Sequence, residues 1–175
     1  LVNLAIGSDT GGSCRIPASY CGITGYKPSH GLVPLTGAYP LSFSFDTIGP
    51  LANSVACCAV AHAIMADDVV APVTPRAPGT LRLAVLKDFV LDGLDAAVER
   101  SFQRALKRLG QAGAGLSDLA FPELQGIPAI NAKGGIVAAE AYQHHRIRMA
   151  AEGQVYDPRV RARIEMAEGI LAADY

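Results

Sequence analysis

Apolar residues recur along this chain with two different spacings, and each spacing predicts one kind of element. A short apolar run over residues 1–6 is typical of a buried strand, and further strands are predicted at 31–35, 81–86 and 116–121. Apolar residues three and four positions apart predict helices instead. A shorter helix or turn is expected at Ile16-Pro17-Ala18. The longer predicted helices cover 55–65, 95–110, 136–150 and 158–175.

Capping residues support these helix boundaries. A side-chain oxygen just before a helix accepts a hydrogen bond from its first turn, and Asn53 or Ser54, Asp95, and Asp157 stand at such positions. Gly110 is expected to end the second long helix. The last helix is expected to continue to the neighbourhood of Tyr175.

The order of the elements predicts an α/β fold with a mixed β-sheet core flanked by helices. A βαβ unit with a right-handed crossover is expected from strand 81–86, the helix after it and strand 116–121. The proline-rich stretch 67–80 is interpreted as a linker between segment 1–66 and segment 81–175. At 175 residues the chain is long enough for a single domain with one core.

A glycine-rich turn after the first predicted strand is the most informative stretch of the sequence. It reads Gly7-Ser8-Asp9-Thr10-Gly11-Gly12-Ser13-Cys14-Arg15, and such glycines permit left-handed backbone and close approach of other groups. Ser13 ends the turn beside two residues that have no side chain to shield it. An exposed hydroxyl of this kind attacks carbonyl carbon, and free backbone N–H groups nearby hold the oxyanion that forms.

The turn also admits other interpretations. A phosphate-binding P-loop requires lysine where Ser13 stands, and the G-x-S-x-G nucleophile elbow requires glycine where Arg15 stands. A tight structural turn without chemistry is an equal alternative from composition alone. A Ser–His mechanism would need His30, His144 or His145 beside the hydroxyl.

Residues 7–18 resemble the amidase signature family of serine hydrolases. The resemblance continues through 21–29 and 44–51 and becomes diffuse towards the end of the chain. It implies a Ser–cis-Ser–Lys triad with Ser13 as nucleophile, and it disfavours the Ser–His alternative. The cis-serine and the lysine lie upstream of this motif in the family, so the chain is expected to be an internal fragment, inactive alone. The resemblance also implies an oxyanion hole built from the backbone N–H groups of Thr10, Gly11, Gly12 and Ser13.

The same resemblance implies supporting roles around the turn. Asp9 and Arg15 are expected to brace the loop, the alternative being a surface ion pair of little energetic weight. Lys27 belongs to a supporting block, and Cys14 stands where a branched aliphatic residue is more usual. The aromatic cluster 39–45 corresponds to a region near the acyl pocket, although ordinary core packing is as good an interpretation. Asp46 is expected to fix the turn before Gly49-Pro50.

Composition narrows the classes of partner. The net charge is −1, from 15 basic and 16 acidic residues, which argues against nucleic acid and anionic membranes. The apolar stretch 55–66 is too short to span a bilayer, and no secretory signal is visible. The four cysteines match no zinc pattern and are expected to be free thiols, which is typical of a cytoplasmic enzyme. His62 is interpreted as a satisfied core residue, and Glu140 with His144 as a solvated or hydrogen-bonded helix face, too small for a metal site.

These observations predict that the full-length protein hydrolyses a carboxylic amide to an acid and ammonia or an amine. No metal or organic cofactor is implied. The expected partner is a small-molecule amide, and a homodimer is kept open. One alternative is the amidase (A) subunit of a tRNA-dependent amidotransferase. Another, of a different class, is a non-catalytic scaffold that retains the signature.

Overall fold

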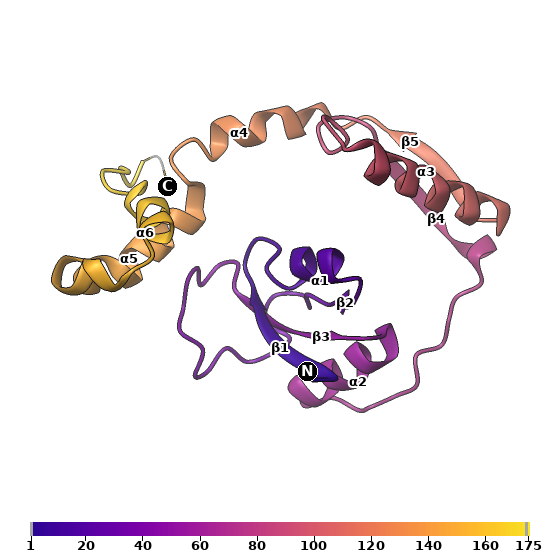
Figure 1. Cartoon of the computed structure of the whole chain (residues 1–175), viewed down its shortest axis with the longest axis horizontal. Coiled ribbons are helices and arrows are strands. Elements are labelled where there is room, and N and C mark those ends of the chain that lie inside the picture. Colours follow the sequence, from indigo (N-terminus) through magenta and orange to yellow (C-terminus); the bar gives the residue numbers. More distant parts are fainter. Residues whose placement is uncertain (1, 174) are drawn as a thin grey trace. The chain divides into compact units, whose positions relative to one another are not determined.

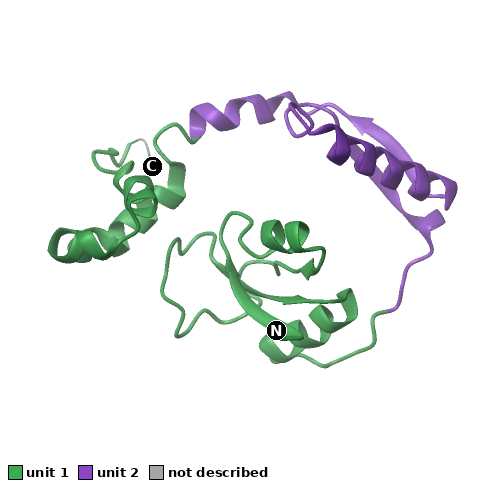
Figure 2. Ribbon diagram, in the orientation of Figure 1, with its two compact units in different colours: residues 1–73, 131–175 green, residues 74–130 purple. Residues whose placement is uncertain are grey.

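The structure is a computed structural model that describes residues 2–173 and 175 of the chain. It divides into two compact units, one of residues 1–73 and 131–175 and the other of residues 74–130 (Figure 2). Both contain helices and strands, so the predicted mixed α/β class is confirmed. The linker at 67–80 stays a prediction.

The first unit contains a three-stranded antiparallel sheet (Figure 1). Strands β1 (Leu4–Asp9), β3 (Thr47–Ala52) and β2 (Thr24–Gly25) lie in the order β1-β3-β2. The first predicted strand therefore exists, but it starts later and runs into the glycine motif as far as Asp9. The expectation that it is buried is wrong, since Leu4 and Ile6 are exposed. As an edge strand, β1 has a sheet neighbour on one side only among the described residues.

The region between β2 and β3 departs most from the predictions. No strand forms at 31–35, where Gly31 has a φ of +83° and Pro34 has no N–H to donate. Strand β3 was missed because Gly49 and Pro50 are typical of turns. Gly49 is required there, because a Cβ would lie 1.9 Å from the carbonyl oxygen of Tyr26. The Pro50 carbonyl accepts a hydrogen bond from the Tyr26 N–H at 3.0 Å.

Two helices accompany this sheet. Helix α1 (Arg15–Cys21) confirms the short predicted helix, and it ends at Gly22 in the left-handed conformation. Helix α2 (Val55–Met65) is capped by Ser54, whose side chain accepts from the N–H of Cys57 at 3.2 Å. In α2 Cys58 is buried, whereas Val55 is exposed.

The C-terminal part of the same unit consists of helices. Helix α5 (Gly135–Glu152) is followed by the 3-10 helix η3 (Gly153–Val155) and by α6 (Pro158–Glu165). The Asp157 carboxylate accepts from the N–H of Arg159, which confirms the predicted cap. Helix α6 does not continue towards Tyr175, because it ends at Glu165 and a turn at Gly169, with φ of +82°, follows. Ala141, Met149 and Ile164 form a small core between α5 and α6.

The second unit is the predicted βαβ arrangement. Strands β4 (Arg82–Leu86) and β5 (Gly115–Leu119) pair in parallel, and α3 (Ala96–Gln111) connects them. Asp95 caps α3 by accepting from the N–H of Ala97 at 2.7 Å. Gly110 lies inside the helix and does not end it; the left-handed residue is Gly113, with φ of +96°. The remaining elements are η1 (Pro78–Thr80), η2 (Pro122–Gly126) and α4 (Ile127–Ile130).

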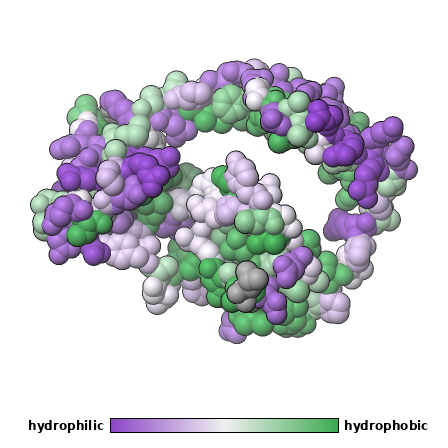
Figure 3. Space-filling view, in the orientation of Figure 1, coloured by the Kyte–Doolittle hydropathy of each residue, from purple (hydrophilic) through white to green (hydrophobic). Residues whose placement is uncertain are grey.

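Apolar residues gather on the surface around the N-terminal end of β1 and over α2 (Figure 3). All four cysteines are free, as predicted. No helix among the described residues is both long and apolar enough to cross a membrane. Within residues 2–173 and 175, no three His, Cys, Asp or Glu side chains come together as metal ligands.

Candidate active site

Ser13 lies in the turn that joins β1 to α1, two residues before the helix begins. Its neighbours Gly12 and Cys14 are buried, whereas Ser13 itself is exposed. Its hydroxyl makes no hydrogen bond to another residue in the described part of the chain. The strand–turn–helix geometry thus exposes this hydroxyl, while the backbone on either side of it is buried.

Asp9, the last residue of β1, holds that backbone. The carboxylate is completely buried and accepts from the N–H groups of Gly12 at 2.6 Å, Cys14 at 3.2 Å and Arg15 at 3.4 Å. The Arg15 guanidinium adds a bidentate pair, with Nε 3.0 Å from Oδ2 and Nη2 3.1 Å from Oδ1. Asp9 is therefore the centre of the turn, and its pairing with Arg15 is not a contact between two surface side chains.

The pKa of Asp9 reflects these contacts. Burial by itself raises the pKa of the carboxyl, because the charged form loses its hydration. The hydrogen bonds and charge of Arg15, with the N–H groups of Cys14 and Gly12, outweigh burial and lower the pKa from 3.8 to about 2. Asp9 is thus an anion at neutral pH, which is the state that its five donors require.

The four backbone N–H groups expected in the oxyanion hole are not equivalent. The N–H of Gly12 donates to Asp9 and is occupied. Those of Thr10, Gly11 and Ser13 donate to no other described residue. Gly12 has a φ of +131°, and a Cβ there would lie 2.6 Å from Cδ1 of Ile16. Glycine is needed at this position for the backbone path.

Segment 22–29 supports the turn from the other side. A Cβ on Gly25 would lie 2.4 Å from the carbonyl oxygen of Cys14, so β2 approaches the turn as closely as backbone allows. The Cys14 thiol is fully buried, and Sγ lies 3.8 Å from the carbonyl oxygen of Gly49. Burial raises the pKa of this thiol, which favours the uncharged form. Cys14 therefore acts as a small packing residue beside Ser13.

A cavity of about 330 Å³ opens next to Ser13. Its wall is largely apolar, and part of it comes from the aromatic cluster at 39–45. The structure thus brings together the turn and a cluster that lies about thirty residues later in the sequence. The lining residues are Ser8, Thr10, Ser13, His30, Leu35, Ala38, Tyr39, Pro40, Leu41, Phe43, Asp46, Thr47 and Ile48.

Asp46 connects this wall to the turn, a role that sequence reasoning missed. Its carboxylate accepts from the Thr10 hydroxyl at 2.5 Å and from the N–H groups of Leu41 at 2.8 Å and Ser42 at 2.9 Å. As expected, Asp46 also fixes the turn at 42–46 that precedes Gly49-Pro50, where its own N–H donates to the Ser42 carbonyl at 2.8 Å. An aspartate after a serine-rich stretch is typical of local turns, but nothing in the sequence identifies Thr10 as its partner.

Glu140 on α5 is buried as well, like Asp9 and Asp46 of this unit, with 1% of the residue exposed. It accepts hydrogen bonds from Ser42, Ser44 and Tyr175. The prediction of a hydrogen-bonded face is confirmed for Glu140 but not for His144, whose Nε2 is buried without a hydrogen-bond partner among the described residues. Burial alone raises the pKa of Glu140, but the donated hydrogen bonds outweigh it and lower the pKa.

None of the remaining candidates hydrogen-bonds to the Ser13 hydroxyl in the described part of the chain. Lys27 donates from Nζ to the carbonyl of Pro28 at 2.8 Å. His62 is half-buried against the Tyr26 ring, with 5.0 Å between ring centroids. The interpretation of His62 as a satisfied histidine is wrong, because its Nδ1 has no hydrogen-bond partner among the described residues. His30 lines the cavity, whereas His144 and His145 lie on α5.

Comparison with known proteins places this geometry in a family. Relatives include 2-amino-5-chloromuconic acid deaminase of Comamonas testosteroni, which is 34% identical over 98% of this chain and 38% of the relative. The A subunit of the glutamyl-tRNA(Gln) amidotransferase from Trichormus variabilis is 36% identical over 72% of this chain and 29% of the relative. The chain spans well under half the length of these relatives.

A solved crystal structure of an amidase superposes with a TM-score of 0.86 at 31% identity, covering 98% of this chain and 38% of that protein. The described fold therefore corresponds to part of a larger enzyme fold. The family model for amidases matches residues 1–174, which is nearly the whole sequence. On this match, the chain belongs to the amidase signature family.

Proposed function

We propose that the full-length protein hydrolyses a carboxylic amide, with Ser13 as the nucleophile. The proposal rests on Ser13, an exposed serine on a turn that the buried Asp9 fixes. Ser13 lines a largely apolar cavity, and the chain belongs to the amidase family. The expected partner is a small-molecule amide. A cytoplasmic location and a homodimer stay predictions.

The reaction follows from the chemistry of a serine nucleophile. The Ser13 oxygen attacks the amide carbon, and a base removes the hydroxyl proton as the C–O bond forms. The proton passes to the amide nitrogen, the C–N bond breaks, and ammonia or an amine leaves an ester on Ser13. Water then attacks the ester and releases the acid. The family resemblance assigns the proton transfers to a serine and a lysine upstream of this motif.

The oxyanion would be held by backbone N–H groups of the turn. Three of the four expected donors, on Thr10, Gly11 and Ser13, are available in the described structure. The fourth, on Gly12, donates to Asp9, so we assign Gly12 to the support of the turn. Asp9 and Arg15 then fix the donors before the substrate arrives, which is how an oxyanion hole lowers a barrier.

Membership of an amidotransferase is the second candidate, favoured by the 36% identity to the Trichormus protein over part of the chain. In that case the ammonia released would pass to a partner protein. Free ammonia released from simple amides by the protein alone favours hydrolysis. Ammonia release only from glutamine and only in the presence of partner proteins favours the amidotransferase.

The proposal is tested with Ser13→Ala in the full-length protein. Loss of the nucleophile should lower kcat by about a thousandfold or more, since the rest of the site retains only residual catalysis. Circular dichroism should be unchanged, because an exposed hydroxyl contributes little to packing. The matched control is Ser19→Ala, an exposed serine on α1 outside the cavity, which should keep full activity.

A serine-directed phosphonate gives an independent readout. Mass spectrometry of the wild-type protein should locate the label on Ser13. Label on Ser8 or Cys14, or full turnover by the Ser13→Ala variant, would overturn the assignment.

A further inference from the structure

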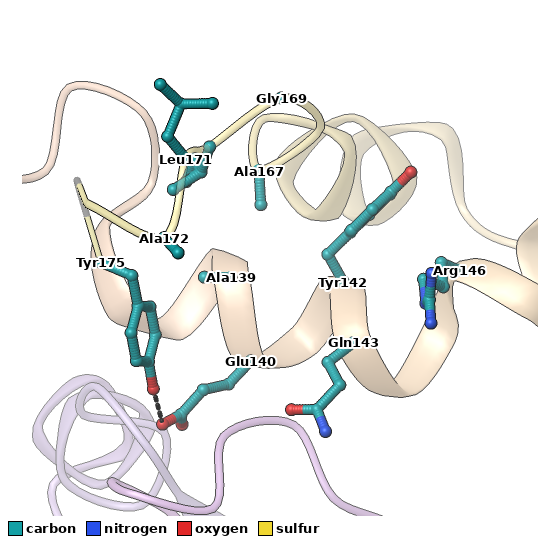
Figure 4. Close-up of a pocket in the computed structure, with 11 residues that line it drawn as sticks. Ala139, Glu140, Tyr142, Gln143, Arg146, Ala167, Gly169, Leu171, Ala172 and Tyr175 are labelled. Carbon is teal, nitrogen blue, oxygen red and sulfur yellow. Dashed lines mark hydrogen bonds between the residues drawn. The ribbon is translucent and has the colours of Figure 1, made fainter.

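Glu140 lies on α5, yet its hydrogen bonds go to a loop nearly a hundred residues earlier in the chain. The Ser42 hydroxyl donates to Oε2, the Ser44 N–H donates to Oε2 at 3.1 Å, and the Ser44 hydroxyl donates to Oε1 at 2.5 Å. Tyr175 adds a hydroxyl to Oε1 at 2.9 Å. In Figure 4, Glu140 points from α5 towards this loop and meets the Tyr175 hydroxyl.

Ser42 and Ser44 alternate with Leu41 and Phe43 in that loop, so the polar and the apolar side chains lie on opposite sides of it. Leu41 and Phe43 line the cavity that contains Ser13. The serines face the opposite way, into the buried carboxylate. Glu140 therefore holds the polar side of a wall whose apolar side faces the candidate substrate cavity.

Other contacts from α5 act on the same wall. The His144 ring meets Phe43 edge-on, with centroids 6.4 Å apart, and the His145 ring lies 5.2 Å from Tyr39. At its far end the loop is fastened by Asp46 to Thr10 of the nucleophile turn. The wall is thus fixed at one end to the turn and along its length to α5.

We propose that Glu140 is a positioning residue that fixes the 39–46 wall of the cavity, so that α5 determines how the acyl group of the substrate is bound. This inference rests on the function proposed above. Because the wall is aromatic and aliphatic, the acyl group it fits is apolar, as in an aromatic amide. Glu140 touches no reacting atom, so its loss should affect binding more than chemistry.

The first test compares two amides in full-length Glu140→Gln. The glutamine side chain keeps the size but presents an NH₂ group to partners that are themselves donors. KM for benzamide should rise about tenfold, the equivalent of one hydrogen bond to a buried charge. By the same reasoning kcat should stay within about threefold, and kinetics on acetamide, too small to reach the wall, should not change. The control is Glu152→Gln, an exposed glutamate of the same helix.

The second test does not depend on activity. Hydrogen exchange of the peptide containing 39–46 should be up to about tenfold faster in Glu140→Gln, since a donor replaces one of the two carboxylate oxygens that accept from this loop. Exchange over 7–14 should be unchanged. If Glu140→Gln does not fold, Ser42→Ala combined with Ser44→Ala should give the same exchange pattern.

The outcomes separate the two proposals. Unchanged exchange over 39–46, or a fall in kcat with KM unchanged, overturns the inference about Glu140. A wild-type protein that hydrolyses neither amide counts against the proposed function, and the exchange result then decides the positioning role alone.

Discussion

The Ser13 turn and the junction between α5 and loop 39–46 are both built around a buried carboxylate, but their partners differ. Asp9 accepts from the charged Arg15 and from backbone N–H groups no more than six residues away. Glu140 accepts from serine and tyrosine hydroxyls and from one backbone N–H, all at least 35 residues distant. One site is local and charge-paired, and the other is distant and uses neutral donors.

The difference shows what each carboxylate contributes. A local charged pair fixes the shape of a single turn. Because the sequence separation is short, the entropy lost on closing the loop is small. A distant carboxylate surrounded by hydroxyls joins two parts of the chain and forms only once the fold is complete. Removing Asp9 should therefore damage the turn most, whereas removing Glu140 should loosen a junction.

The largest effect is expected for Asp9→Asn in the full-length protein. The substitution leaves Arg15 without its carboxylate and turns an NH₂ group towards buried N–H donors. The free energy of unfolding should fall by about 3 kcal/mol or more, as for other broken buried pairs. Glu140→Gln should cost about 2 kcal/mol, since no charged partner is left behind.

Urea denaturation monitored by circular dichroism measures both values. The control is Glu165→Gln, which breaks the half-exposed pair with Arg161 and should cost about 0.5 kcal/mol. A loss at Asp9 no greater than the loss at Glu165 would contradict the comparison.

The next effect concerns acid stability. The pKa of Asp9 is lowered from 3.8 to about 2, so its contribution is complete above pH 3.8 and disappears as the pH falls through 2. The lowered pKa corresponds to about 2 kcal/mol of stability at neutral pH. The difference in unfolding free energy between wild type and Asp9→Asn should therefore shrink by that amount between pH 5 and pH 2. Parallel stability curves over this range would contradict the assignment.

The smallest expected effect on stability concerns the backbone conformation of Gly12, whose N–H donates to Asp9. Gly12 has a φ of +131° and Ile16 against it, whereas a Cβ on Gly11 would meet nothing within 4 Å. Gly12→Ala should therefore destabilise the protein by about 1 to 2 kcal/mol more than Gly11→Ala. Thermal melts of the two variants make the comparison, and equal melting temperatures would show that the turn does not need glycine at position 12.

The sequence by itself determined the local features of this protein. Helix α5 follows from its apolar spacing, and α2, α3 and α6 also from caps at Ser54, Asp95 and Asp157, because these signals act within one helical turn. The glycine motif identified the family and the candidate nucleophile, since a turn of this kind is specified by consecutive residues. The pairing of β4 with β5 followed from the order strand–helix–strand.

Only the tertiary structure decided the long-range contacts. Strand β3 could not be predicted, because Gly49 and Pro50 are typical of turns. They fit a strand here because the Tyr26 carbonyl lies against Gly49 and the Tyr26 N–H donates to the Pro50 carbonyl. The acceptor of Ser42 and Ser44 lies on a helix nearly a hundred residues later, and no periodicity relates the two segments. Hydrogen-bond partners at such separations are chosen by packing, because a serine or a glutamate carries no local signal of which distant group it will meet.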